Sequence, residues 1–108
     1  MDAIQSLAAL AHDGRLSVYR CLVRAGPKGL AAGEVAARVR IQPNTLSAQL
    51  SLLSNAGLIH SRREGRSIIY SADLEALNRL VLYLIEDCCE GRADVCGPIL
   101  EALQASKC

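Results

Sequence analysis

The sequence predicts a mainly α-helical fold with one small β-hairpin, and three observations lead to this expectation. Hydrophobic residues make up 51% of the 108 residues, yet there is no Trp or Phe, so the core must consist of aliphatic side chains that pack well between helices. Gly and Pro divide the chain into short elements, one pair of which alternates about a central Gly65 as in a hairpin. A chain of this length fits one hydrophobic core, so we expect a single domain over residues 1–108.

Four helices are expected before the hairpin. Asp13 is placed to cap the second of them, and Asn44 is placed to cap the fourth. From Leu46 in the fourth helix, leucines recur at i, i+4 and i+7, which is the spacing of one helical face, and Gly57 has the position of a C-terminal stop. The third and fourth helices are short and joined by a tight turn, as in a helix-turn-helix. The expected helices span residues 3–11, 13–23, 34–39 and 44–56.

The second half of the chain predicts the hairpin and one further helix. The hairpin is expected to comprise residues 59–63 and 67–71, with a charged tip. A last long helix is expected to run from Asp73 toward Gly91, with leucines, valines and isoleucines at helical spacing. This helix offers more apolar surface than one small domain need bury. We therefore expect a winged helix-turn-helix that dimerises through its terminal helices.

The charge of the chain is unevenly distributed, although the formal net charge is only +1. Residues 38–70 have a net charge of +4, whereas residues 71–108 have a net charge of −4. A basic segment in a nearly neutral protein suits contact with phosphates, because DNA binding replaces condensed counterions locally. The charges alone also fit a solvated surface without a partner. Together with the helix-turn-helix, they predict double-stranded DNA as the partner.

In such a motif the second helix enters the major groove, while the hairpin reaches the adjacent backbone or minor groove. Short polar side chains near the start of that helix are therefore candidates for reading base edges, with Gln49 the best of them. Helix capping alone also explains Asn44 and Thr45, and solvent exposure explains Ser47 and the hairpin tip. The candidate base contacts are Gln42, Asn44, Thr45, Ser47 and Gln49, and the candidate phosphate contacts are Arg62, Arg63 and Arg66.

Three stretches of the chain, in this order, resemble the ArsR/SmtB family. They are residues 7–16 (LAALAHDGRL), 44–50 (NTLSAQL) and 55–59 (NAGLI). That family consists of dimeric winged-helix repressors that release operator DNA on binding metal or metalloid ions, and the resemblance implies the same behaviour for this chain. Where members commonly have a His-His pair in the recognition helix, this chain has Ala48 and Gln49, so the operator sequence is not implied.

The five cysteines are expected to be free thiols. Their number is odd, and the N-terminus lacks a basic segment followed by an apolar one, so the disulfide framework of an exported protein explains them poorly. The longest apolar run, residues 80–85, is far shorter than the roughly 20 residues that cross a bilayer. These observations predict a cytoplasmic protein without a membrane-spanning segment.

Three of these cysteines, Cys88, Cys89 and Cys96, lie near the end of the last expected helix, where Gly91 allows the chain to turn. A three-sulfur site without a nearby His suits arsenic(III) or antimony(III), which take pyramidal trithiolate coordination, better than a four-coordinate zinc ion. Acidic residues beside the cysteine pair attract divalent cations, so cadmium, lead and zinc stay open as ligands. Buried thiols without a ligand and a thiol-redox switch are further alternatives.

Residues 86–92 followed by Cys96 resemble arsenic-responsive members of the family, which place their site at this helix end. The resemblance implies that the three cysteines bind arsenic(III). The family's cysteine motif in the third helix is absent, and its zinc site on the last helix lacks the His residues. Of the other cysteines, Cys21 is expected in the core, and Cys108 is expected to be a bystander at the end of the chain.

The sequence therefore predicts a metalloid-responsive repressor that binds operator DNA as a homodimer and is released when arsenite or antimonite binds the three cysteines. A repressor of the same fold that senses thiol oxidation, cadmium or lead is the alternative. A small thiol enzyme is a third alternative, but a catalytic thiol needs a base or an electropositive setting, and here acidic residues surround the cysteine pair. We expect no enzymatic activity.

Overall fold

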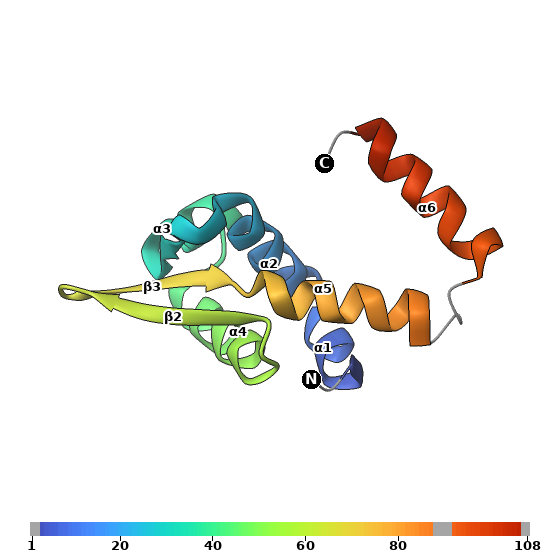
Figure 1. Cartoon of the computed structure of the whole chain (residues 1–108). Coiled ribbons are helices and arrows are strands. Elements are labelled where there is room, and N and C mark those ends of the chain that lie inside the picture. Colours follow the sequence, from blue (N-terminus) through green and yellow to red (C-terminus); the bar gives the residue numbers. More distant parts are fainter. Residues whose placement is uncertain (1–2, 88–91, 107–108) are drawn as a thin grey trace.

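A computed structural model describes residues 3–87 and 92–106 of the chain (Figure 1). Helices pack around the inner end of a three-stranded antiparallel sheet with the strand order β1-β3-β2, and the hairpin of β2 and β3 extends away from them as a wing. The elements are α1 (Ala3–Leu10), α2 (Asp13–Ala25), the 3-10 turn η1 (Gly26–Lys28), β1 (Leu30–Ala31), α3 (Ala32–Val39), α4 (Pro43–Asn55), β2 (Ile59–Glu64), β3 (Ser67–Ala72), α5 (Leu74–Leu82), the π turn η2 (Tyr83–Asp87) and α6 (Ala93–Ser106).

The core lies where α2, α3 and α4 meet the inner end of the sheet. Leu22 of α2, Val35 of α3 and Leu53 of α4 are fully buried in one aliphatic cluster. Burial of each such side chain stabilises the fold by about 1.5–3 kcal/mol. The ring of Tyr19 is also buried, and this burial, with a smaller contribution from the carboxylate of Asp73, raises the pKa of Tyr19 above its usual value. The aliphatic core expected from the composition is confirmed.

The helix starts differ from the sequence-based expectation in two places. His12, and not Asp13, caps α2, because the imidazole Nδ1 accepts from the Gly14 N–H at 3.1 Å. Asp13 is instead the first residue of the helix, where a carboxylate interacts favourably with the helix dipole. Gln42, and not Asn44, stands at the N-cap position of α4, and Asn44 is already within the helix.

The expected hairpin is present and is one residue longer in each strand. β2 pairs with β3 in antiparallel register, with Arg62 opposite Ile69, and Gly65 turns the chain at a φ of 61°. The short strand β1, which pairs Leu30 with Tyr70, was not predicted, because two residues are too few to show an alternating pattern.

Gly29 occupies a position that no other residue type can easily fill. Its φ is 72°, and a Cβ atom at this site would lie 2.5 Å from the Tyr70 carbonyl oxygen and 2.6 Å from Ser71 Oγ. We expect Gly29→Ala to lower the free energy of unfolding by at least about 2 kcal/mol, because backbone strain and a steric clash add together.

The matched control is Gly33→Ala, since a Cβ atom at this exposed position of α3 meets nothing within 4 Å. There we expect stability to rise by up to about 1 kcal/mol, the helix propensity difference between the two residues. Thermal and urea unfolding of both variants measure the effect. Equal unfolding midpoints for the two variants would contradict the close approach of Gly29 to β3.

The C-terminal third differs most from the expectation of one long helix from Asp73 toward Gly91. α5 ends at Leu82 and continues as the π turn η2, after which α6 forms a separate helix that was not predicted. Gly97 and Pro98 within α6 are both unfavourable in a helix interior, so the local sequence argues against a helix there. None of the described side chains of α6 is buried, and α6 stands apart from the core in Figure 1.

Within residues 3–87 and 92–106, none of the helices has the length and apolarity that spanning a bilayer requires.

Candidate nucleic-acid interface

α3 and α4 form a helix-turn-helix whose turn comprises residues 40–42. Arg40 ends α3 in the left-handed region with a φ of 57°, and the Ile41 N–H donates to the Ala36 carbonyl oxygen at 3.3 Å. Pro43 then begins α4 at a position where the missing N–H costs no helical hydrogen bond. The turn thus packs α3 against α4 and leaves the first turn of α4 at the surface.

The start of α4 presents polar side chains to solvent. Asn44, Thr45 and Ser47 are exposed, whereas Leu46 between them is buried. Gln42 is exposed immediately before the helix. Four of the five residues predicted to contact bases therefore lie together at the accessible end of α4, where a recognition helix presents side chains to the major groove.

Gln49 does not lie with these four, and the expectation that it reads bases is wrong for this conformation. Its side chain is only 6% exposed and lies against Gly14 at the start of α2, where an added Cβ atom would clash with the Gln49 amide nitrogen. Gln49 follows Leu46 by three residues and precedes Leu53 by four, which places it on the apolar face of α4. The helical spacing in the sequence therefore indicates that Gln49 faces inward.

Arg62 was also expected to contact DNA, but the structure uses its donors within the protein. Nε donates to Glu64 Oε2 at 2.6 Å, Nη2 donates to the Lys28 carbonyl oxygen at 2.6 Å, and Nη1 donates to the Pro27 carbonyl oxygen at 3.2 Å. The two bonds to carbonyl oxygens attach the wing to η1, whereas the bond to Glu64 lies within β2. Arg62 therefore has a structural role in this conformation, which the sequence spacing does not reveal. Its side chain is 44% exposed, and the phosphate contact stays a prediction.

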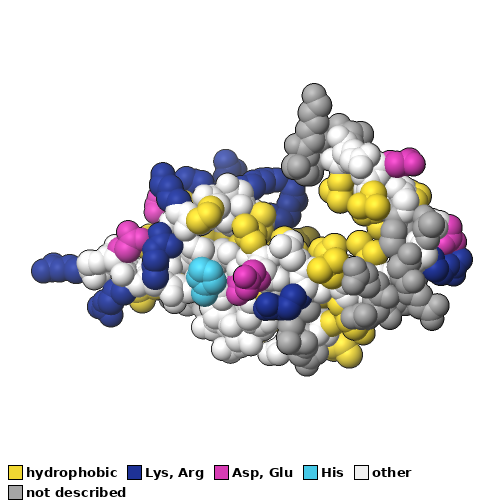
Figure 2. Space-filling model, viewed as in Figure 1, with side chains coloured by type: hydrophobic (Ala, Val, Ile, Leu, Met, Phe, Trp, Pro, Cys, Tyr) yellow, Lys and Arg dark blue, Asp and Glu magenta, His cyan; other side chains and the backbone are white. Residues whose placement is uncertain are grey.

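Arg63 and Arg66 are exposed on the wing. Successive residues of a strand point to opposite faces, so Arg63 extends away from the face on which Arg62 binds η1. Figure 2 shows most of the Lys and Arg side chains over the wing and the adjoining helices, with fewer around α6. The basic character expected for the middle of the chain thus belongs to the same end of the molecule as α4 and the wing.

The cysteines predicted to bind metalloid fall largely outside the described residues. Cys88 and Cys89 lie outside them, and Cys96 is the fourth residue of α6, with a side chain that is not described. Cys21 is half-buried and packs at the edge of the core, close to the expectation for this residue. In the part of the chain that the structure describes, no three His, Cys, Asp or Glu side chains form a group that could bind a metal ion.

Comparisons with known proteins agree with this geometry. Residues 10–62, from the end of α1 to the middle of β2, match a family described as a helix-turn-helix domain. The biofilm growth-associated repressor of Agrobacterium fabrum is 37% identical in an alignment of 81 positions that covers 73% of this chain and 67% of the repressor. The structure of an ArsR-like transcriptional regulator from a Rhodococcus species has a TM-score of 0.73 at 23% identity, covering 95% of this chain and 91% of that chain. This chain belongs to the ArsR/SmtB family of winged helix-turn-helix transcriptional regulators.

A further solved structure concerns the assembly of such proteins. The winged helix-turn-helix DNA-binding domain of a possible ArsR-family regulator from Mycobacterium bovis is homodimeric in solution. It has a TM-score of 0.61 and 27% identity to this ArsR/SmtB regulator, covering 82% of each chain.

Two neighbouring arginines of this ArsR/SmtB regulator have different expected roles. Replacing Arg62 by alanine is expected to lower the free energy of unfolding by about 1–2 kcal/mol, because it removes charge-assisted hydrogen bonds between the wing and η1. Replacing Arg63 by alanine is expected to leave unfolding unchanged and to reduce the slope of log affinity against log salt by about 0.9, the value for one phosphate contact.

Thermal unfolding and the fluorescence anisotropy of a labelled duplex at several salt concentrations measure both effects. The two variants are each other's control, since each removes one positive charge from the same strand. An Arg62→Ala protein that is as stable as wild type, but has the reduced salt slope, would show that Arg62 binds DNA and not η1.

Proposed function

We propose that this regulator is a repressor that binds operator DNA as a homodimer and releases it when arsenite binds Cys88, Cys89 and Cys96. The observation that supports DNA binding is the exposed polar start of α4 together with the basic wing. In a dimer, two such helices enter successive major grooves about 34 Å apart, the length of one DNA turn. The wing arginines then contact the adjacent phosphates.

The exposed apolar side chains support the homodimer. Ile4 of α1 is 80% exposed, and Leu82 at the end of α5 is 50% exposed, with Leu7, Val81 and Tyr83 exposed beside them in the sequence. If a second copy of the chain covers these side chains, their burial stabilises the dimer by roughly 25 cal/mol per Å² of apolar surface. The dimeric relative from Mycobacterium bovis supports the same assembly.

The segment that precedes the cysteine pair supports a sensor site at the end of α5. η2 is a π turn, a feature that is frequent at functional sites, and it ends at Asp87, directly before Cys88 in the chain. Cys96 follows within the first turn of α6. The three thiols are thus close in the sequence, with Cys88 and Cys89 following η2 along the chain and Cys96 in α6, whereas Cys21 lies in α2.

The chemistry of arsenous acid suits three thiols in acidic surroundings. The acid exchanges its three hydroxyl groups for three thiolates, each thiol proton leaves with one hydroxyl group as water, and the product is neutral. Soft sulfur donors favour arsenic(III) and antimony(III) over hard cations. Because no net charge is added, acidic residues such as Glu86 and Asp87 do not contribute the attraction that they would offer to a divalent metal ion.

Release of DNA requires that arsenite binds one conformation of the dimer more tightly than another. α5 provides two of the apolar side chains assigned to the dimer interface, Val81 and Leu82, and continues through η2 toward the cysteine pair in the chain. A change at that junction can therefore alter the separation of the two recognition helices. We place the protein in the cytoplasm, where thiols remain reduced.

Counting thiols tests the site independently of DNA. The reduced chain has five cysteines. With one equivalent of arsenite, we expect three of them to be protected from a thiol-specific alkylating reagent in intact-protein mass spectra, and peptide mapping to identify Cys88, Cys89 and Cys96. Protection of fewer than three thiols, or of Cys21, would overturn the proposed site.

A further inference from the structure

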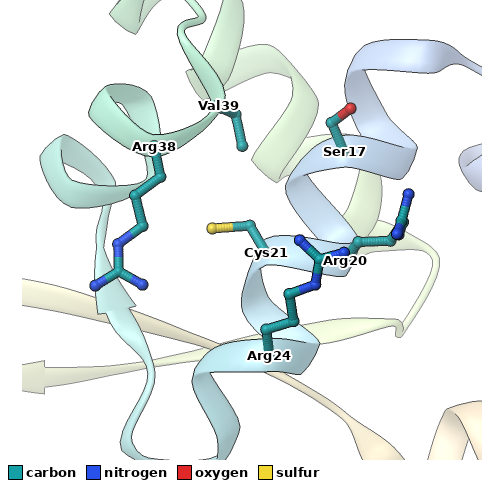
Figure 3. Close-up of a pocket in the computed structure, with 6 residues that line it drawn as sticks. All are labelled: Ser17, Arg20, Cys21, Arg24, Arg38 and Val39. Atoms are coloured by element: carbon teal, nitrogen blue, oxygen red, sulfur yellow. The ribbon is translucent and has the colours of Figure 1, made fainter.

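A second candidate site lies between α2 and α3, outside the surfaces assigned to DNA and to arsenite. It is a cavity of about 410 Å³ (Figure 3). Cys21 and Ser17 of α2 face Val39 across it, with Arg38 on the α3 side and Arg20 and Arg24 on the α2 side. The lining residues are Ser17, Arg20, Cys21, Arg24, Arg38 and Val39, so the cavity has three positive charges and no acidic residue.

The three arginines have no carboxylate partner among the described residues. The ion pairs found there join Arg62 to Glu64, Arg79 to Glu75 and Arg92 to Asp94. Arg15, Arg40, Arg63 and Arg66 also have no ion pair there, so the feature particular to the cavity is that three such arginines line one site.

The three arginines bring like charges to one part of the surface. Arg20 and Arg24 are four residues apart on α2, a spacing at which like charges destabilise a helix slightly. The helix dipole favours Arg24 and Arg38 individually, because each lies in the last turn of its helix. It does not account for Arg20, nor for the presence of all three around one cavity.

We propose that this cavity binds a phosphate group. Guanidinium groups are the preferred donors to phosphate, since their planar N–H groups bond two oxygens at once. The hydroxyl of Ser17 is an additional donor at the rim. Val39 and the half-buried Cys21 form the apolar part of the cavity, and the three arginines are exposed to solvent around it, where they are accessible to an anion.

Two sources could supply such a group. Arg38 and Val39 end α3 directly before the turn of the helix-turn-helix, so the cavity is next to the motif that approaches DNA, and a backbone phosphate is one source. A free phosphate ion is the other source. The DNA source depends on the proposed DNA-binding function, whereas the free-ion source does not.

The experiment uses the whole chain and the variants Arg24→Gln and Arg38→Gln, with Arg79→Gln on α5 as the control for loss of a positive charge. In the first arm, inorganic phosphate is titrated into ¹⁵N-labelled protein against chloride at equal ionic strength. A free-ion site is expected to give saturable shifts of the Ser17, Cys21 and Val39 amides, with at least about tenfold weaker binding in both cavity variants and wild-type binding in the control.

In the second arm, the salt dependence of duplex binding is measured by anisotropy. A DNA site is expected to lose about 0.9 from the slope for each cavity arginine removed, without saturable phosphate shifts and without change in the control. The proposal is overturned if phosphate causes no more change than chloride and if the cavity variants bind duplex with the same slope as Arg79→Gln. Absence of duplex binding by the wild type would count against the proposed function, while the phosphate titration would still test the cavity.

Discussion

Cys96→Ser is expected to bind operator DNA as tightly as wild type and to require at least about 100-fold more arsenite for release, because a serine hydroxyl is a hard donor that replaces soft sulfur poorly. Cys96 lies in α6, away from the exposed start of α4 and the wing, so its loss removes no contact of the proposed DNA interface. Anisotropy of a fluorescent duplex measures both affinity and release.

The matched controls are Cys21→Ser and Cys108→Ser, which change the same atoms elsewhere in the chain. Both are expected to release DNA at the wild-type arsenite concentration. Release of Cys96→Ser by the same amount of arsenite would remove Cys96 from the mechanism. Equal loss of release in Cys21→Ser would instead locate the sensor beside α2.

Leu82→Asp is expected to produce a monomer whose affinity for a two-site operator is at least about 100-fold lower, because linked half-sites gain their affinity from effective concentration. Leu82 is 50% exposed at the end of α5, so a charge there costs little in the monomer and much in an apolar interface. Sedimentation equilibrium measures the assembly, and anisotropy measures the affinity.

Asn78→Asp is the control, since it adds the same charge at another exposed position of α5 without removing an apolar side chain. It is expected to remain dimeric and to bind DNA like wild type. A monomeric Leu82→Asp protein that retains wild-type affinity would contradict the need for a dimer. A dimeric Leu82→Asp protein would place the interface on other residues.

The helix-turn-helix and the wing could be predicted because their signals are local. Leucines at helical spacing indicated the buried face of α4, and Gly57, which has a φ of 77°, directly follows the C-cap residue of that helix. Alternation on both sides of Gly65 indicated the hairpin. The exposure of Asn44, Thr45 and Ser47 follows from the same periodicity.

The same periodicity also assigns Gln49 to the inner face, between Leu46 and Leu53. The polarity of a side chain is thus a weaker guide to the face it occupies than its position in the helix. The role of Arg62 could not be found in this way, since its carbonyl partners on Pro27 and Lys28 lie 35 and 34 residues away in the sequence. Long-range hydrogen bonds of this kind depend on the assembled fold.

The cavity lined by three arginines also depends on the assembled fold. Arg20 and Arg24 are close in the sequence, but Arg38 joins them only because α3 packs against α2. The proposed arsenite site differs, because it can be predicted from the sequence alone. The close spacing of three cysteines along the chain is enough to suggest a ligand site.

The most direct test of the central claim is titration of arsenite into the reduced protein bound to a fluorescent duplex from its own promoter, with zinc titrated in parallel. The proposed mechanism predicts that one equivalent of arsenite per chain lowers the anisotropy to that of free DNA, while zinc at the same concentration leaves the complex intact. A complex that survives excess arsenite, or that zinc dissociates equally well, would contradict a metalloid-specific repressor.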